Sequence, residues 1–161
     1  IYHGPNMPSY PSQLIVEGEV TFQSGRLYSV ALPVYYYWPG AVHGDNQIET
    51  VNVDVETGEL LELADLFDPS TNWLPVLLEA VDAAAEINYP RCFWAPRETD
   101  PATGIKGFNI TPTHLRIYIT PGPNSCRVQP VQVGYLELVD YFDPEFLDHL
   151  SVSSAAKQTS A

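Results

Sequence analysis

The sequence predicts one domain of the α+β class, with a twisted, mostly antiparallel sheet, one main helix packed on it and a short C-terminal helix. Its 161 residues, 45% of them hydrophobic, suffice for a single buried core. Several runs rich in Val, Ile, Leu and Tyr are separated by turn residues, which is typical of β-hairpins. Residues 71–88 repeat apolar side chains every three to four positions, which indicates an amphipathic helix.

Composition divides the chain into three parts. Residues 1–13 hold three prolines and favour an extended arm. Residues 14–150 carry the strand-like and helix-like runs of the predicted α+β domain. Residues 151–161 are small and polar and have no apolar stripe to dock on a core, so we expect a tail without regular structure.

Two β-hairpins are predicted in the first half of the domain. The first joins residues 14–22 to residues 27–38 through a Ser-Gly turn. The second joins residues 47–55 to residues 60–63, and Gly58 is expected to supply the positive φ of its turn.

Two aspartate–proline pairs predict the helix starts. Asp68 and Asp143 are each expected to cap a helix whose first residue is proline, where the missing N–H costs nothing. The main helix should end before Pro90. A long loop over residues 90–107 and strands over residues 108–110, 115–120 and 128–138 complete the predicted elements.

The two segments around these pairs, residues 61–69 and 136–144, agree at seven of nine positions. A repeated corner from strand to helix explains most of this likeness. The alternative is a duplicated acidic corner whose carboxylates bind Ca²⁺, but no complete calcium-loop spacing is present. We therefore expect no metal site.

The charge balance excludes several classes of partner. Twenty acidic and seven basic residues give a net charge of −13, so nucleic acids and anionic membranes should be repelled.

No apolar run is long enough for a spanning helix, and we expect any signal peptide or anchor to lie upstream of Ile1. No phosphate-binding loop is present either, so we expect no nucleotide and no other cofactor.

The two cysteines, Cys92 and Cys126, lie 34 positions apart, a spacing that disfavours a zinc ribbon. Both have prolines nearby and belong to loop-like sequence. They form either one disulfide or two free thiols, and a disulfide would indicate an oxidising compartment.

The most suggestive binding feature is a run of four aromatic residues. In a strand, Tyr35 and Tyr37 point to one face and Tyr36 and Trp38 to the other. One face should belong to the core, and the other could offer rings to a sugar or to a partner's apolar side chain. His43, in a Gly-rich turn, could be a base or ligand, but a local backbone hydrogen bond is the simpler role.

Catalytic patterns are weak. Asp54 and Glu56 resemble a glycosidase carboxylate pair, but they flank a tight turn, where an Asx-type hydrogen bond from Asp54 is the simpler role. No Gly-x-Ser-x-Gly elbow occurs, and neither cysteine has a histidine close in sequence. We assign no catalytic residue.

Three motifs in order resemble the RsiV-like domain, and the likeness extends over residues 14–150. They are Pro-Gly-Ala-Val-His-Gly at residues 39–44, Thr-Val-Asn-Val-Asp-Val-Glu-Thr-Gly at residues 50–58 and Leu-Ala-Asp-Leu-Phe at residues 63–67. RsiV-like domains occur in lysozyme-sensing anti-sigma factors, beside peptidoglycan deacetylase domains and in a secreted mycobacterial antigen. The resemblance therefore implies an α+β domain of the envelope or of a secreted protein, and it does not imply catalysis.

These observations lead to one functional expectation with two alternatives. We expect a non-catalytic, extracytoplasmic binding domain that recognises a cationic protein such as a lysozyme, or a peptidoglycan-derived glycan. The first alternative is a structural accessory module that pairs with another chain through its arm, a sheet edge or its tail. The second alternative is a hydrolase of cell-wall carbohydrate.

Overall fold

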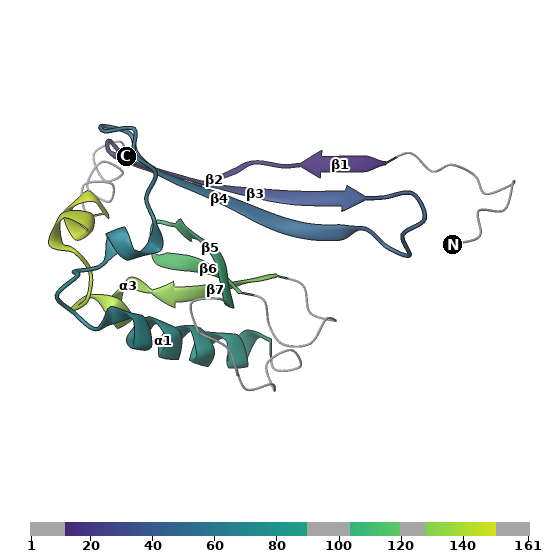
Figure 1. The fold of residues 1–161 in the computed structure, drawn as a ribbon. Coiled ribbons are helices and arrows are strands. Elements are labelled where there is room, and N and C mark those ends of the chain that lie inside the picture. The colour runs from purple at the N-terminus through teal and green to yellow at the C-terminus, as the bar shows by residue number, and fades with distance from the viewer. Residues whose placement is uncertain (1–11, 90–103, 120–127, 151–161) are drawn as a thin grey trace, which may run out of the picture.

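The computed structural model describes residues 12–89, 104–119 and 128–150, and these residues form an α+β fold of two antiparallel sheets and one long helix (Figure 1). The predicted fold class is confirmed, although the strands divide between two sheets where one was expected. The elements in chain order are β1 (Gln13–Val16), β2 (Glu19–Gln23), β3 (Leu27–Tyr37), β4 (Asp45–Asp54), the 3-10 helix η1 (Leu63–Leu66), α1 (Trp73–Asn88), β5 (Ile105–Ile110), β6 (His114–Ile119), β7 (Gln129–Gly134) and α3 (Tyr135–Leu138).

The long strand β3 is the centre of the first sheet. β4 pairs with β3 along one edge, while β1 and β2 share the other edge. The single strand predicted over residues 14–22 is thus two strands, separated at Glu17 and Gly18. The prediction of a strand over residues 60–63 is wrong. In that segment Leu60 forms one isolated β-bridge with Val53. Gly58 has the expected positive φ, +76°.

The second sheet, in the order β5–β6–β7, lies between the first sheet and α1 (Figure 1). Its face toward α1 is aliphatic, and the helix adds Leu77, Val81 and Ala85 to the same core. Burying such side chains contributes about 1.5–3 kcal/mol each. The core residues of the sheet are Phe108, Ile110, Leu115, Ile117, Ile119, Val131 and Val133.

Two predicted boundaries around the second sheet are wrong. β5 begins at Ile105, so the strand takes the last residues of the expected loop. β7 ends at Gly134, where a strand to residue 138 was expected, because one helical turn, α3, follows. The Gly134 N–H donates to Glu137 Oε1 at 3.0 Å, and this bond satisfies a free amide at the start of the turn.

The two aspartates expected to cap helices play different parts. Asp143 Oδ1 accepts a hydrogen bond from the Glu145 amide at 2.7 Å, and residues 144–150 are helical, as expected. Asp68 Oδ1 accepts from the Ser70 amide at 2.8 Å, but α1 does not begin until Trp73. Asp68 therefore caps the turn that precedes the helix instead of the helix itself.

The repeated segments pair with each other. Phe67 and Phe142 form an antiparallel bridge, and their rings stack with centroids 4.9 Å apart. The Asp68 amide donates to the Tyr141 carbonyl at 2.9 Å, and the Asp143 amide donates to the Leu66 carbonyl at 3.0 Å. The repeat thus closes one end of the core. Residues 12–89, 104–119 and 128–150 contain no group of three His, Cys, Asp or Glu side chains able to hold a metal ion.

A buried polar network joins the two sheets. Ser29 and Asn109 are fully buried, and Asn52 is 3% exposed. Ser29 Oγ donates to Asn52 Oδ1 at 2.6 Å and accepts from the Ile110 amide at 3.0 Å. Asn52 Nδ2 donates to the Phe108 carbonyl at 2.9 Å. Side chains of the first sheet therefore satisfy backbone groups on the outer edge of β5, where a neighbouring strand would otherwise pair.

The same junction includes a close backbone approach and an ion pair. A Cβ atom added to Gly107 in β5 would lie 2.6 Å from Thr50 Oγ1 in β4, so a larger residue would force Thr50 to shift. At the other side, Arg116 Nη1 in β6 lies 2.8 Å from Glu19 Oε2 in β2. These contacts involve the halves of β2, β3 and β4 nearest the second sheet.

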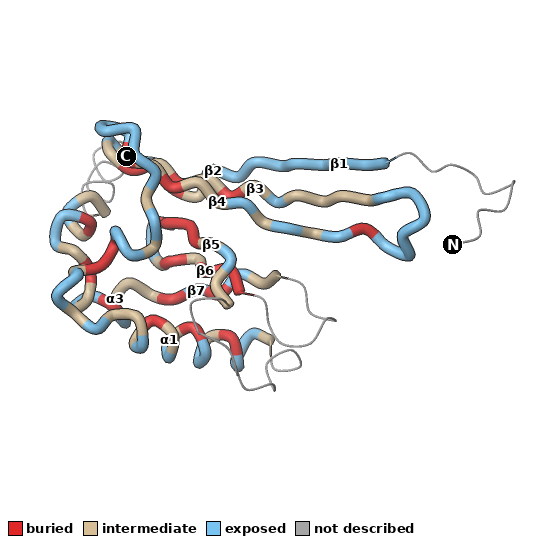
Figure 2. The backbone as a smooth tube through the Cα atoms, viewed as in Figure 1, coloured by how far each residue is buried: buried red, intermediate tan, exposed pale blue. Residues whose placement is uncertain are grey.

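The far half of the β3–β4 hairpin projects beyond the second sheet (Figure 1). Figure 2 shows β1, which pairs with this half, as exposed along its whole length, whereas buried segments gather in the second sheet, α1 and the near half of the hairpin. The core thus holds the hairpin at one end and presents the other end to solvent.

Replacing Ser29 by alanine should destabilise the domain. The change leaves the buried Ile110 amide and Asn52 Oδ1 without a partner, at about 1–3 kcal/mol for each group. We expect the free energy of unfolding in urea to fall by about 2–4 kcal/mol. The control is Ser12→Ala at an exposed position, and equal stability of the two variants would contradict the network's role.

Gly107→Ala should also destabilise the domain, by about 1–3 kcal/mol, because the new methyl group overlaps Thr50. The double variant Gly107→Ala/Thr50→Ala removes the overlapping hydroxyl and should recover most of this loss. Urea unfolding of the two single variants and the double variant measures the coupling. Additive effects would show that the two strands do not touch at this point.

Candidate binding site

The aromatic run at the far end of β3 divides between two faces, as the strand alternation predicts. Tyr36 and Trp38 contact each other edge to face, with ring centroids 6.2 Å apart. The Tyr36 hydroxyl donates to Asp45 Oδ2 at 2.7 Å, which fixes its ring beside β4. Trp38 is 63% exposed, so its indole is available to a ligand.

Tyr35 has a structural contact on the opposite face. Its ring lies over buried Gly44, where an added Cβ atom would come within 2.3 Å of the ring carbons and hydroxyl. Tyr37 is half-buried on the same side. Of the four aromatic residues Trp38 alone is exposed, and half-buried Tyr36 contacts it on the same face.

These two rings belong to a larger apolar surface, which we call the outer face. In β3 the buried residues Leu27, Ser29 and Ala31 define the face toward the second sheet, so the even-numbered residues point outward. The pairing of β1 and β2 with β3 adds their own outward residues. The outer face comprises Leu14 (70% exposed), Val16 (53%), Val20 (52%), Val34, Tyr36 and Trp38 (63%).

Negative charge dominates the described part of the chain. The basic side chains of the described residues are Arg26, Lys106 and Arg116, and residues 55–89 contain no Lys or Arg. The hydrogen bond from Arg116 lowers the pKa of Glu19, which burial raises to a smaller extent. Arg26 Nη1 binds Glu145 Oε1 at 2.5 Å, so both arginines are already engaged by carboxylates. The field at the surface is therefore that of the remaining acids.

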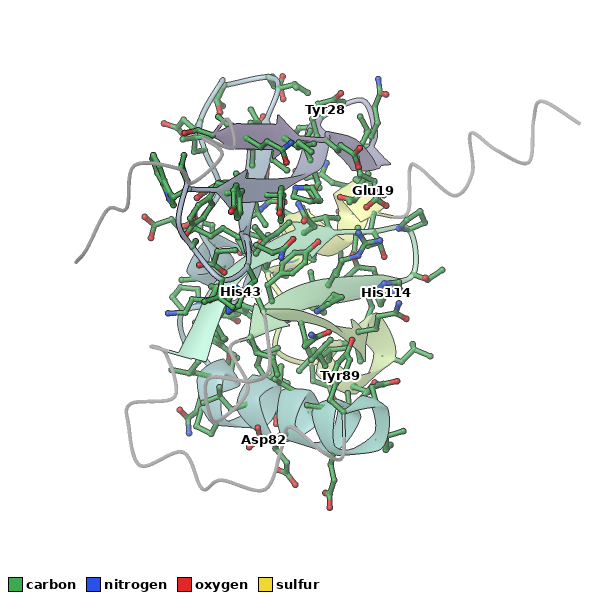
Figure 3. All side chains as sticks on the ribbon, turned by 90° about the vertical axis from the view of Figure 1, so that its right-hand side faces the viewer. Glu19, Tyr28, His43, Asp82, Tyr89 and His114 are labelled. Atoms are coloured by element: carbon green, nitrogen blue, oxygen red, sulfur yellow. The ribbon has the colours of Figure 1, made fainter. Side chains whose placement is uncertain are left out.

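His43 lies in the turn between β3 and β4. It is exposed, and its Nδ1 is 2.9 Å from the carbonyl oxygen of Gly44, which is the local backbone contact considered from the sequence. His114 lies apart from it on β6 (Figure 3), where burial, and next the charge of Arg116, lower its pKa. The two imidazoles do not converge on a site.

The carboxylate pair at the second turn is engaged in structural bonds. Asp54 Oδ1 accepts the expected Asx-type hydrogen bonds from the amides of Glu56 and Thr57, at 2.9 and 3.2 Å. Asp54 Oδ2 lies 2.7 Å from Arg26 Nε, and this hydrogen bond lowers the pKa of Asp54. A general acid needs a raised pKa, so this arrangement does not suit acid catalysis.

Some sequence hypotheses cannot be placed. The cysteines Cys92 and Cys126 lie outside the described residues, as do most of the arm and the whole of the tail. Among the residues that are described, no helix is long and apolar enough to span a membrane. The exposure of β1 was missed, because three consecutive apolar residues, Leu14, Ile15 and Val16, are equally typical of a buried strand.

Comparison with known proteins finds likeness in structure alone. No family model and no curated protein matches the sequence. A DUF3298 family protein from Pseudomonas aeruginosa PAO1 superposes with a TM-score of 0.59 and 17% identity, over 84% of this chain and 63% of that chain. A DUF3298 family member from Bacteroides fragilis NCTC 9343 superposes with a TM-score of 0.66 and 14% identity, over 88% of this chain and 58% of that chain.

The chain is similar in fold to DUF3298 family proteins. At such low identity the likeness concerns the fold, and the chain spans about three-fifths of the length of these two structures. The DUF3298 family is related to the RsiV-like domains that the sequence motifs resemble. The DUF3298 fold therefore agrees with the architecture that the motifs imply.

Asp54→Asn tests the ion pair in this DUF3298-like fold. The folded-state pKa of Asp54 is below its ordinary value of about 4, so its contribution is complete above that pH and is lost as the pH falls through the lower, folded value. The variant should be less stable than the wild type at pH 7 and pH 5, and the gap should narrow below about pH 4.

Urea unfolding at several pH values measures this gap. Exposed Asp140→Asn, which removes the same charge elsewhere, is the control and should show a smaller difference at pH 7. A gap for Asp54→Asn that stays constant or widens down to about pH 3 would contradict the assignment.

Proposed function

We propose that the chain is a non-catalytic binding domain that acts outside the cytoplasm and recognises a cationic protein, such as a lysozyme. The observation that carries this proposal is the outer face, where Trp38 and Leu14 are 63% and 70% exposed on a projecting sheet. Large exposed apolar surfaces are unusual on soluble proteins unless they meet a partner.

Charge supports a cationic partner. The whole chain has a net charge of −13, and its field attracts basic proteins over roughly one Debye length, about 8–10 Å at moderate salt. Apolar anchors such as Trp38 then supply contacts that salt does not weaken. The partner expected from this combination is a basic protein with an apolar patch.

The extracytoplasmic location and the choice of a lysozyme rest on the resemblance to RsiV-like domains, some of which sense lysozyme. The related fold of the DUF3298 structures supports this resemblance. A hydrolase receives no such support, because Asp54 is held by Arg26 and by its own turn. A peptidoglycan glycan and a structural partner chain are competing outcomes of the experiment below.

Calorimetric titration with a lysozyme tests the proposal. We expect binding that survives moderate salt, while an equally basic control protein such as cytochrome c loses its binding as salt rises. Trp38→Ala and Leu14→Ala should each weaken lysozyme binding by about tenfold. Leu136→Ala, at a leucine that is 88% exposed outside the outer face, is the matched control and should leave the affinity unchanged.

Equal binding of both basic proteins, or no binding, would overturn the cationic-partner proposal. Binding of muropeptides instead, weakened by Trp38→Ala, would assign the outer face to a glycan. If Trp38→Ala and Leu14→Ala bind lysozyme as tightly as the control Leu136→Ala and the wild type, the outer face is not the contact surface.

A further inference from the structure

The outer edge of β1 has backbone groups that point away from the sheet. The Glu17 amide donates to the Pro33 carbonyl at 3.2 Å. Ile15, two positions before Glu17, pairs with Tyr35, two positions after Pro33. Hydrogen-bonded positions alternate along an antiparallel ladder, so Ile15 directs its N–H and C=O to β3. Leu14 and Val16 therefore direct their N–H and C=O to the free edge.

This edge also lacks the usual protection against pairing. Residues Gln13–Val16 contain no charge and no proline, and each of them is exposed. β4, at the opposite side of the sheet, carries Asp45 and Glu49, and charged side chains are the common means of blunting an edge. Among the described residues, β3 is the one strand that pairs with β1.

The side chains beside the edge specify what would fit there. An added strand places alternate residues on the two faces of the sheet. On the outer face they would lie beside Leu14 and Val16, which favours aliphatic residues. On the other face they would lie beside Ile15 and Glu17, and the carboxylate of exposed Glu17 favours a Lys or Arg.

We propose that the β1 edge binds an extended segment of a cationic protein in which aliphatic residues alternate with Lys or Arg. The inference rests on the proposed function, because it takes a basic protein as the partner, and it adds the mode of binding. The new strand would form backbone hydrogen bonds with Leu14 and Val16, while its aliphatic side chains extend the outer face. Its cationic side chains would lie on the side of Glu17, within the acidic field of the domain.

A synthetic peptide tests the edge directly. The probe is an acetylated and amidated octapeptide of four Lys-Val repeats, titrated by calorimetry at moderate salt. A second peptide has the same side chains but is N-methylated at every other residue, so it keeps the charge and loses the hydrogen-bond donors of one edge. We expect N-methylation to weaken binding at least about tenfold.

Val16→Pro provides the matching change in the protein. Proline removes the outward N–H of Val16 and is tolerated on an edge strand, so the ladder between β1 and β3 should persist. Val16→Ala shortens the side chain and keeps the N–H, so it tests the loss of apolar contact alone. We expect Val16→Pro to weaken the Lys-Val peptide at least about tenfold and Val16→Ala to weaken it by less than about threefold. Circular dichroism and urea unfolding verify that both variants are folded.

The outcomes separate this inference from the proposed function. Absence of peptide binding, or equal affinity for the two peptides, overturns the edge inference. Lysozyme binding that Val16→Pro leaves unchanged, while Trp38→Ala weakens it, overturns the edge inference and keeps the proposed function. Sedimentation that shows a dimer abolished by Val16→Pro would assign the edge to a second copy and also overturn the inference.

Discussion

The junction between the two sheets depends on side chains that take the place of a strand. The edge strand β5 would leave the Phe108 carbonyl and the Ile110 amide buried without partners, and each such group costs about 1–3 kcal/mol. Asn52 and Ser29 satisfy them from the first sheet. Hydrogen bonds are directional, so these bonds determine the orientation of the first sheet relative to the second. Apolar contacts are not directional and would allow more orientations.

This junction explains why one half of the hairpin is exposed. The polar bonds and the close approach of Gly107 to Thr50 engage the near half of β3 and β4. Among the described residues the far half has no such anchor in the second sheet, and it projects and carries β1 with it (Figure 1). The outer face and the free edge are therefore consequences of where the sheets are joined. A sheet that is already formed loses less conformational entropy on binding than a segment that must order when its partner binds.

Local patterns predicted much of the fold, and long-range contacts determined the rest. The alternation of β3 and β4 and the period of α1 are local signals, and so are the turn at Gly58 and the cap at Asp143. The division into two sheets was not predictable, because it depends on bonds such as that between Ser29 and Ile110, 81 positions apart. The aromatic pair at the site followed from strand alternation. The exposure of β1 depends on which of the described strands pair with it, and no local pattern gives that information.

An amide-resolved NMR titration with a lysozyme at moderate salt tests the central claim most directly, because it maps the contact surface without any substitution. The account predicts that the largest shift changes fall on β1 and on the far half of β3, around Leu14, Val16, Tyr36 and Trp38. Amides of α1 should change little, although Glu79, Asp82 and Glu86 make this helix acidic too. Changes concentrated on α1, or spread evenly over the acidic surface, would contradict the claim that the outer face of the projecting sheet is the binding site.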